Sequence, residues 1–140
     1  MKSIHALFII SFLAFGLVSC TKEKSTMASD VAVNNLVAGE WKVTYLFRDS
    51  IDHTVEFNNY TLVYDPGGSL TGANSLYAVH GEWSVAENQT VTSLTMAFHT
   101  AHTGADVFDE IAGTWVIETN SQDRMVLHHD ADYMYMERVK

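Results

Sequence analysis

Apolar and polar residues alternate along most of the chain from residue 40 onwards. The first alternating segment runs from Glu40 to Arg48, and its bulky side chains fall on every second position: Trp41, Val43, Tyr45 and Phe47. A period of two over this length predicts a half-buried β-strand. Because similar segments recur to the end of the chain, the sequence predicts an all-β domain.

Seven further segments of this kind follow, which makes eight expected strands. They are Tyr60–Tyr64, Ser69–Ala73 (which 76–80 continues or replaces), Glu82–Ala86, Leu94–His99, Thr114–Thr119, Arg124–His129 and Tyr133–Val139. Short segments joined mostly in sequence order favour a small eight-stranded up-and-down antiparallel barrel, since closure removes exposed sheet edges. A two-sheet sandwich of the same strands is the alternative.

Three connections between these strands have recognisable chemistry. Asp65-Pro66-Gly67-Gly68 is the clearest turn, because proline presets its own φ and glycine accepts a positive one. Residues 49–59 form a polar connection in which Phe57 is expected to point inward. Val107, Phe108 and Ile111 have helical spacing, which predicts one or two helical turns within residues 102–112 that pack on one end of the sheet.

All three tryptophans stand two residues after a glycine, at the expected head of a strand. The pairs are Gly39 and Trp41, Gly81 and Trp83, and Gly113 and Trp115. Tryptophans could line a ligand pocket, but large aromatic side chains in a small barrel mostly fill its core. We therefore expect this motif to be structural.

The amino-terminal residues are typical of a secretory signal peptide. Lys2 is positive, and residues 4–18 form an apolar run that is short for a membrane span. The run ends in Leu17-Val18-Ser19-Cys20, which resembles the bacterial lipobox. That resemblance implies removal of residues 1–19 and acylation of Cys20, for example with palmitate, so that the chain is a lipoprotein anchored to the lipid bilayer.

The lipobox divides the chain into three expected parts. After the signal peptide, residues 20–35 form a lipid-anchored tether without a sustained period, and residues 36–140 form the barrel domain. Cys20 is the only cysteine, so no disulfide stabilises the domain. Thr21 rather than aspartate after the lipidated cysteine implies the outer membrane more than the inner one, with a periplasmic and a surface-exposed position both open.

Charge and motifs exclude several classes of function. The formal net charge is −9, which argues against nucleic acid and against electrostatic docking of the chain on an anionic membrane. No nucleophile elbow, phosphate loop or zinc-protease motif occurs, so neither an enzyme nor a cofactor is expected. His99 with His102, or His128 with His129, could bind a metal ion together with carboxylates. Adjacent residues of a strand point to opposite faces, so His128 and His129 cannot both bind one ion without distortion. No metal site is therefore expected.

Several short motifs together resemble the lipocalin-like lipoproteins of Bacteroidetes. They are Cys20, Gly39-x-Trp41, Phe57-x-x-Tyr60 with Gly67-Gly68, Gly81-x-Trp83 and Trp115. The resemblance covers residues 36–140 and implies a lipocalin-like barrel at the cell envelope that binds a small apolar ligand or peptide.

Ligand contacts are expected from side chains in the middle of inward-facing strands. The candidates are Tyr45, Val85, Met96, Phe98, Ile117 and Leu127. Met96, Met125, Met134 and Met136 would suit an apolar guest, because methionine adapts its shape, and would equally suit an irregular core. The alternative function is a protein-interaction module, either a hydrolase inhibitor or a structural component of an envelope complex. It would act through loop Asp49–His53 or Ala101–Asp106.

Overall fold

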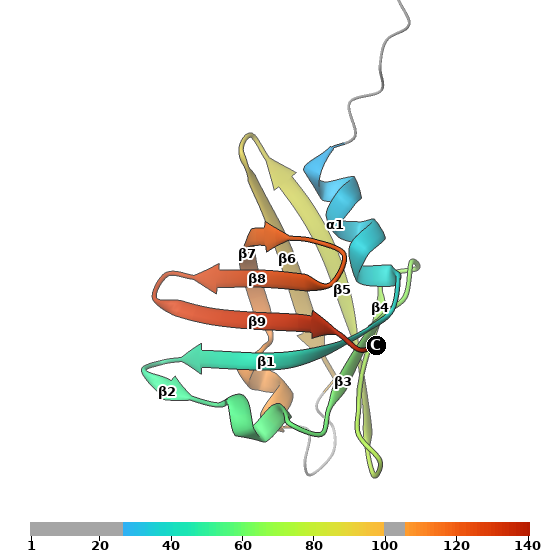
Figure 1. Cartoon of the computed structure of the whole chain (residues 1–140), viewed down its shortest axis with the longest axis vertical. Helices are drawn as coiled ribbons and strands as arrows, with labels where there is room; N and C mark the ends of the chain where they lie inside the picture. The colour runs from blue at the N-terminus through green and yellow to red at the C-terminus, as the bar shows by residue number, and fades with distance from the viewer. Residues whose placement is uncertain (1–26, 100–105) are drawn as a thin grey trace, which may run out of the picture.

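Nine strands and three short helices are formed by residues 27–99 and 106–140, which the computed structural model describes (Figure 1). The strands are β1 (Glu40–Arg48), β2 (Ile51–Asp52), β3 (Thr61–Tyr64), β4 (Ser69–Ala73), β5 (Ala78–Asn88), β6 (Val91–Phe98), β7 (Gly113–Asn120), β8 (Arg124–His129) and β9 (Asp132–Arg138). The helices are α1 (Ala28–Val37) and the 3-10 helices η1 (Thr54–Phe57) and η2 (Asp106–Glu110).

The eight longer strands close into an antiparallel barrel. Strands β3 to β8 each pair with the next strand in sequence, and β1 pairs with both β3 and β9. The seam with β9 runs from Trp41 opposite Arg138 to Phe47 opposite Tyr133. The two residues of β2 fold back and pair antiparallel with Phe47 and Arg48 at the end of β1. The predicted up-and-down barrel is therefore confirmed, and every long strand has a partner on both sides.

Strand β1 contains an irregularity that the alternating pattern did not reveal. The pairing with β9 shifts register between Val43 and Tyr45. An extra residue in one strand turns the following side chains to the opposite face. Trp41 and Val43 point into the barrel, but after the shift it is Leu46 that is buried.

Gly81 lies inside β5 rather than at the start of a strand. A Cβ atom built on Gly81 would lie 2.1 Å from the carbonyl oxygen of Ala97, on the paired strand β6. Only glycine permits the two backbones to come this close. The strand expected to begin at Glu82 therefore begins at Ala78. Gly113, by contrast, is the first residue of β7 and has a φ of 118°.

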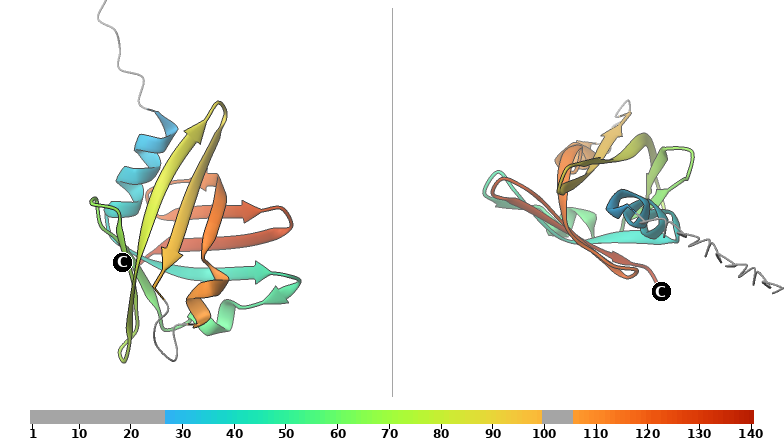
Figure 2. Two further views of the ribbon diagram at one scale, coloured as in Figure 1. Left: turned by 180° about the vertical axis from the view of Figure 1, so that it is seen from behind. Right: turned by 90° about the horizontal axis from the view of Figure 1, so that it is seen from above.

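Helix α1 covers one end of the barrel, where the sequence had suggested a tether up to residue 35. The helix packs against β1, β3, β5, β6 and β7 (Figure 2). Ala32 and Leu36 are one helical turn apart, so both point into the barrel mouth, where they are buried. The expectation of a tether was wrong for residues 28–35. Only two side chains of the helix, Ala32 and Leu36, are buried, and two buried positions are too few to show a helical period in the sequence. Residues 1–26, with Cys20, lie outside the described residues.

An aromatic cluster closes the other end of the barrel. The ring of Phe108, from η2, lies 4.9 Å from Phe98, 5.1 Å from Tyr60 and 6.0 Å from Phe57 between ring centroids. Phe57 and Phe108 are fully buried, as is Ile111 just after η2. Phe57 thus points inward, as predicted. Helical turns near residue 108 also pack on one end of the sheet, and they form a 3-10 helix. Residues 102–105 lie outside the described part.

Candidate functional site

Four methionines and one tyrosine belong to the buried core of the barrel. Met96 comes from β6, Met125 from β8, and Met134 and Met136 from β9, and all four are buried. The hydroxyl of Tyr64, on β3, donates to the Met96 sulfur at 3.2 Å and lies 3.5 Å from the Met136 sulfur. Burial raises the pKa of the Tyr64 hydroxyl well above its ordinary value, so the group stays neutral.

Five of the six predicted ligand contacts face this interior. Met96 and Leu127 are buried, and the half-buried residues Val85, Phe98 and Ile117 pack against the same core. Phe98 belongs to the aromatic cluster that closes one end, whereas Val85 and Ile117 lie on β5 and β7. Side chains from four strands, β5 to β8, therefore pack together in one apolar core. A ligand inside the barrel would contact these side chains.

Tyr45 does not belong to this group, and the prediction that it faces inward was wrong. The register shift in β1 turns it to the outside of the barrel, where its ring lies 5.0 Å from that of Tyr135 on β9. Strict alternation from Trp41 would have placed Tyr45 inside. Leu46 takes the inward position instead.

The three Gly-x-Trp tryptophans share one hydrogen-bonding arrangement. Each indole Nε1 donates to a backbone carbonyl oxygen: Trp41 to Leu36 at 3.0 Å, Trp83 to Asp65 at 2.9 Å and Trp115 to Ile111 at 2.9 Å. Each bond holds the chain segment that closes part of the barrel, namely the end of α1, the β3–β4 turn and the end of η2. Because each indole is buried and its N–H group has a hydrogen-bond partner, these side chains have a structural role in the barrel.

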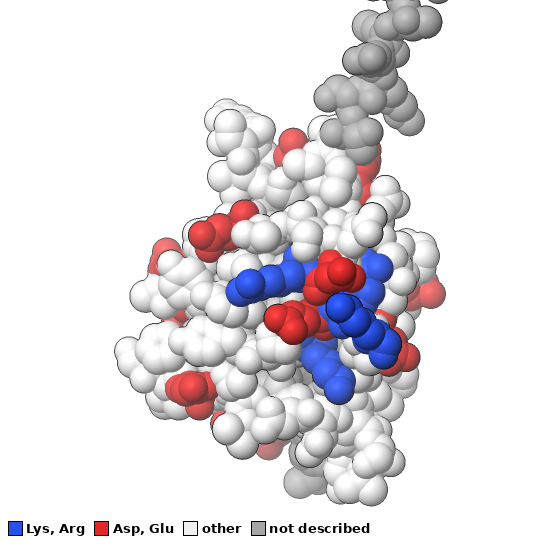
Figure 3. All heavy atoms as spheres, viewed as in Figure 1, with Lys and Arg blue, Asp and Glu red and all other residues white. Residues whose placement is uncertain are grey.

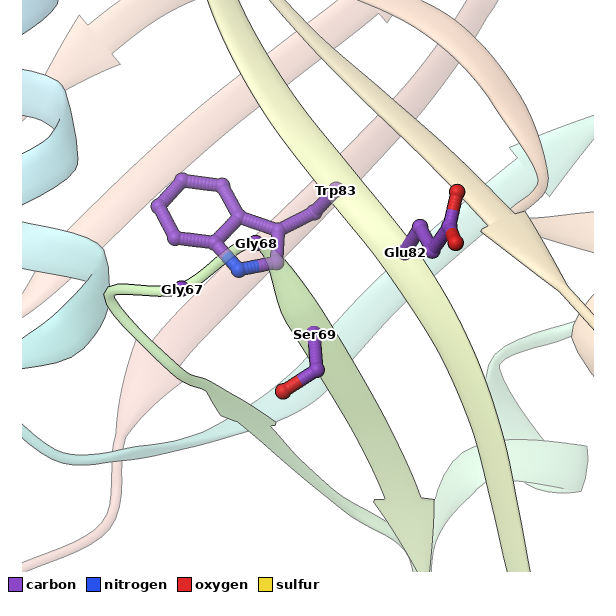
Figure 4. Close-up of a pocket in the computed structure, with 5 residues that line it drawn as sticks. All are labelled: Gly67, Gly68, Ser69, Glu82 and Trp83. Atoms are coloured by element: carbon purple, nitrogen blue, oxygen red, sulfur yellow. The ribbon is translucent and has the colours of Figure 1, made fainter.

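A hollow of about 340 Å³ opens at the β3–β4 turn, and sequence reasoning missed it. Gly67, Gly68, Ser69, Glu82 and Trp83 line it (Figure 4). The indole of Trp83 lies over the glycine turn, whereas the Glu82 carboxylate points away from it (Figure 4). A second hollow of about 180 Å³ shares Glu82 and Trp83 and continues over β5 and β6. Ser69 and Glu82 are exposed, so these hollows belong to the outer surface.

The histidines have ordinary surface surroundings. His53 Nδ1 lies 3.1 Å from Glu56 Oε1, and its Nε2 lies 3.7 Å from Glu110 Oε2. His128 packs beside Tyr133, and His129 lies 3.8 Å from Asp130. Among residues 27–99 and 106–140, no group of three potential metal ligands is close enough to hold an ion. His102 lies outside this part of the chain.

One of the two loops proposed for partner binding is described in full. Asp49 and Ser50 adopt positive φ angles of 51° and 67° and turn the chain from β1 into β2. This tight turn presents Ile51 with 56% of its surface exposed. Of the second loop, 101–106, only Asp106 is described. None of the helices within the described ranges is long and apolar enough to cross a bilayer.

Comparisons with known proteins bear on the fold. No protein-family profile and no curated protein sequence matches the chain. Two solved structures are similar to this chain. One is a lipocalin-like protein from Bacteroides uniformis, with a TM-score of 0.54 and 13% sequence identity. The other is a DUF4847 family protein from Bacteroides vulgatus, with a TM-score of 0.55 and 12% sequence identity. The match to the Bacteroides uniformis protein covers 74% of this chain and 98% of that protein. The match to the Bacteroides vulgatus protein covers 75% of this chain and 95% of that protein. The resemblance found in the sequence is thus confirmed for the fold: the domain is a lipocalin-like barrel of the kind found in these Bacteroides proteins.

Proposed function

We propose that the chain is a lipid-anchored envelope protein whose lipocalin-like barrel binds a small apolar ligand or peptide. The observation that carries the proposal is the presence of four buried methionines in the barrel core, two of which, Met96 and Met136, lie against the Tyr64 hydroxyl. Unbranched thioether side chains change rotamer readily, so this centre can rearrange around a guest where a core of branched side chains could not. Similarity to lipocalin-like structures supports the same choice by fold alone.

Entry to this centre would pass the end that α1 covers. The helix fully buries two side chains, Ala32 and Leu36, and four hydrogen bonds join it to the strands. The Ser29 N–H donates to Glu87 Oε2 at 3.0 Å, and Asn35 Nδ2 donates to Asn120 Oδ1 at 2.8 Å. Arg138 donates to the Asn35 carbonyl at 3.1 Å, and Trp41 Nε1 donates to the Leu36 carbonyl at 3.0 Å. The opposite end is filled by aromatic rings that pack mostly edge to face. We therefore assign α1 as the movable side of the barrel, since its displacement exposes less apolar surface.

Binding can be tested with the apolar fluorophore N-phenyl-1-naphthylamine and by native mass spectrometry of protein from its own host. We expect fluorescence enhancement that Leu127→Trp abolishes, because the larger side chain fills the interior. Val126→Trp is the matched control, since Val126 is the neighbouring residue on the outer face of β8. A protein that always arrives empty, with probe binding unaffected by Leu127→Trp, would rule out an internal ligand.

Anchoring is tested separately by metabolic labelling with an alkyne fatty acid. Lipidation at Cys20 requires that the label be lost in Cys20→Ala and that the wild-type protein fractionate with the outer membrane. A wild-type protein without label would refute the anchor and leave the ligand proposal standing.

The second candidate function is a protein-interaction module. It is favoured by the turn at Asp49 and Ser50, which presents an exposed Ile51 on a rigid two-stranded support. An exposed apolar side chain held directly after a tight turn suits insertion into a partner's pocket. A photo-crosslinking residue at position 51 in intact cells would capture one reproducible envelope protein if this function holds, and none if it does not.

A further inference from the structure

Basic residues gather on one face of this acidic chain. The sequence holds 17 acidic and 8 basic residues, yet all five basic residues in the described part lie on or beside β1, β8 and β9. Arg48 reaches across to the carbonyl oxygens at the end of η2, and the other basic residues gather on one face (Figure 3). They are Lys42, Arg124, Arg138 and Lys140. Glu137 lies between two of them, paired across the sheet with Lys42 and with Arg124. The whole-chain charge therefore hides a locally balanced surface.

Aromatic side chains continue the same face along the strands. On the outer side of the barrel, Tyr45 stands opposite Tyr135, and Phe47 stands opposite Tyr133. Val126 and His128 on β8 extend these two rows. All of them are at least partly exposed, with Tyr133 at 38%. A contiguous apolar and aromatic patch on the outside of a closed barrel marks a contact surface.

The proposed anchor keeps this face close to a bilayer. Seven residues, 20–26, separate the acyl group from the first described residue. A fully extended chain of that length spans about 25 Å. One side of the domain must therefore face the membrane surface much of the time, and a strongly acidic side would be repelled by anionic headgroups. This step rests on the proposed lipidation of Cys20.

We propose that the outer face of β1, β8 and β9 lies against the anionic phospholipid headgroups of the membrane to which the chain is tethered. Lys42, Arg124 and Lys140 meet the phosphates, and the tyrosine rings, which are apolar with a polar tip, occupy the interfacial layer. Tethering makes a weak contact sufficient to orient the domain, because the effective concentration of the surface is high. Without a tether, the net negative charge keeps the domain in solution.

The orientation can be measured on the chain from Cys20 to Lys140, prepared without acylation. Cys20 is its only cysteine, so it can be coupled to a maleimide lipid in nanodiscs of phosphatidylethanolamine and phosphatidylglycerol that carry a gadolinium-chelate lipid. We expect stronger NMR line broadening for the amides of Thr44 and Tyr135 than for those of Ser84 and Thr95. The latter two lie on β5 and β6, across the barrel (Figure 2).

Two matched variants separate this proposal from a general charge effect. Lys42→Gln combined with Arg124→Gln should lower the preference for the β1–β8–β9 face, by about fivefold for each cation removed. Ser84→Glu combined with Ala97→Glu changes the net charge equally on exposed positions of the opposite face and should preserve the preference. Equal broadening of both faces, or a preference that the double glutamine variant retains, would overturn the proposal. Because the tether is supplied chemically, neither result depends on native lipidation or on an internal ligand.

Discussion

The Tyr64 hydroxyl donates a hydrogen bond to the Met96 sulfur across 3.2 Å in the centre of the barrel. A thioether is a weak acceptor, and burial shields the hydroxyl from bulk solvent. The hydrogen bond therefore offsets the cost of burying this hydroxyl in the apolar core and adds little to the stability of the protein. It also makes the core sensitive to the ionisation of one tyrosine.

Alkaline pH should destabilise the protein through Tyr64. Burial raises the folded-state pKa of this group above its unfolded value near 10. The unfolded chain therefore loses the proton first, and above pH 10 the free energy of unfolding falls by about 1.4 kcal/mol per pH unit. Urea denaturation at pH 9, 10 and 11 measures this slope. Tyr64→Phe should reduce it, whereas Tyr133→Phe at an exposed position should not; equal slopes in both variants would contradict the assignment.

Gly81→Ala should destabilise the barrel more than Gly39→Ala. At position 81 the added methyl meets the backbone oxygen of Ala97 at 2.1 Å, and a strand backbone cannot move away without breaking its pairing. At position 39 it meets only the movable Arg138 Cδ at 3.2 Å. We expect a loss of about 1–3 kcal/mol or more for Gly81→Ala. Thermal unfolding checks this, and similar midpoints for the two variants would show that the β5–β6 approach is not tight.

Leu36→Ala should loosen helix α1 from the barrel mouth. Leu36 is fully buried there, and its carbonyl accepts the Trp41 indole N–H. Removing a buried leucine side chain costs about 2–5 kcal/mol. Hydrogen exchange should show α1 amides opening before those of the strands. Val31→Ala, on the exposed side of the same helix, serves as the control and should change stability by less than about 0.5 kcal/mol.

Arg48→Ala should destabilise the end of the barrel that η2 covers. Its guanidinium donates to the carbonyl oxygens of Asp109, Glu110 and Ala112 at 3.2, 2.6 and 3.1 Å, and it lies 5.9 Å from the Trp115 ring centroid. Loss of these charge-assisted bonds should cost about 1.5–3 kcal/mol. Chemical denaturation gives the value. Arg124→Ala, which removes an exposed guanidinium stacked 5.2 Å from Tyr135, should cost far less.

Much of the fold could be predicted from residue order because short-range chemistry decides it. Ser69–Ala73 and Arg124–His129 were predicted with the bounds that β4 and β8 have. Each strand alternates apolar and polar residues between turn residues, and Asp65-Pro66-Gly67-Gly68 admits little but a turn. Eight such strands in series favour the closed barrel, since any open arrangement leaves two edges unpaired.

The interior and the two ends of the barrel depended on the tertiary structure. The register shift in β1 arises where Val43 pairs with Met136 and Tyr45 pairs with Tyr135, far apart along the chain, and it alone turns Tyr45 outward. Helix α1 contains three valines and two asparagines, which form helices poorly, so it is stable only because the barrel mouth accepts Ala32 and Leu36. Alternation in the sequence thus determined which segments are strands. Contacts between distant segments decided which side chains reach the centre, because register and burial exist only once the barrel has closed.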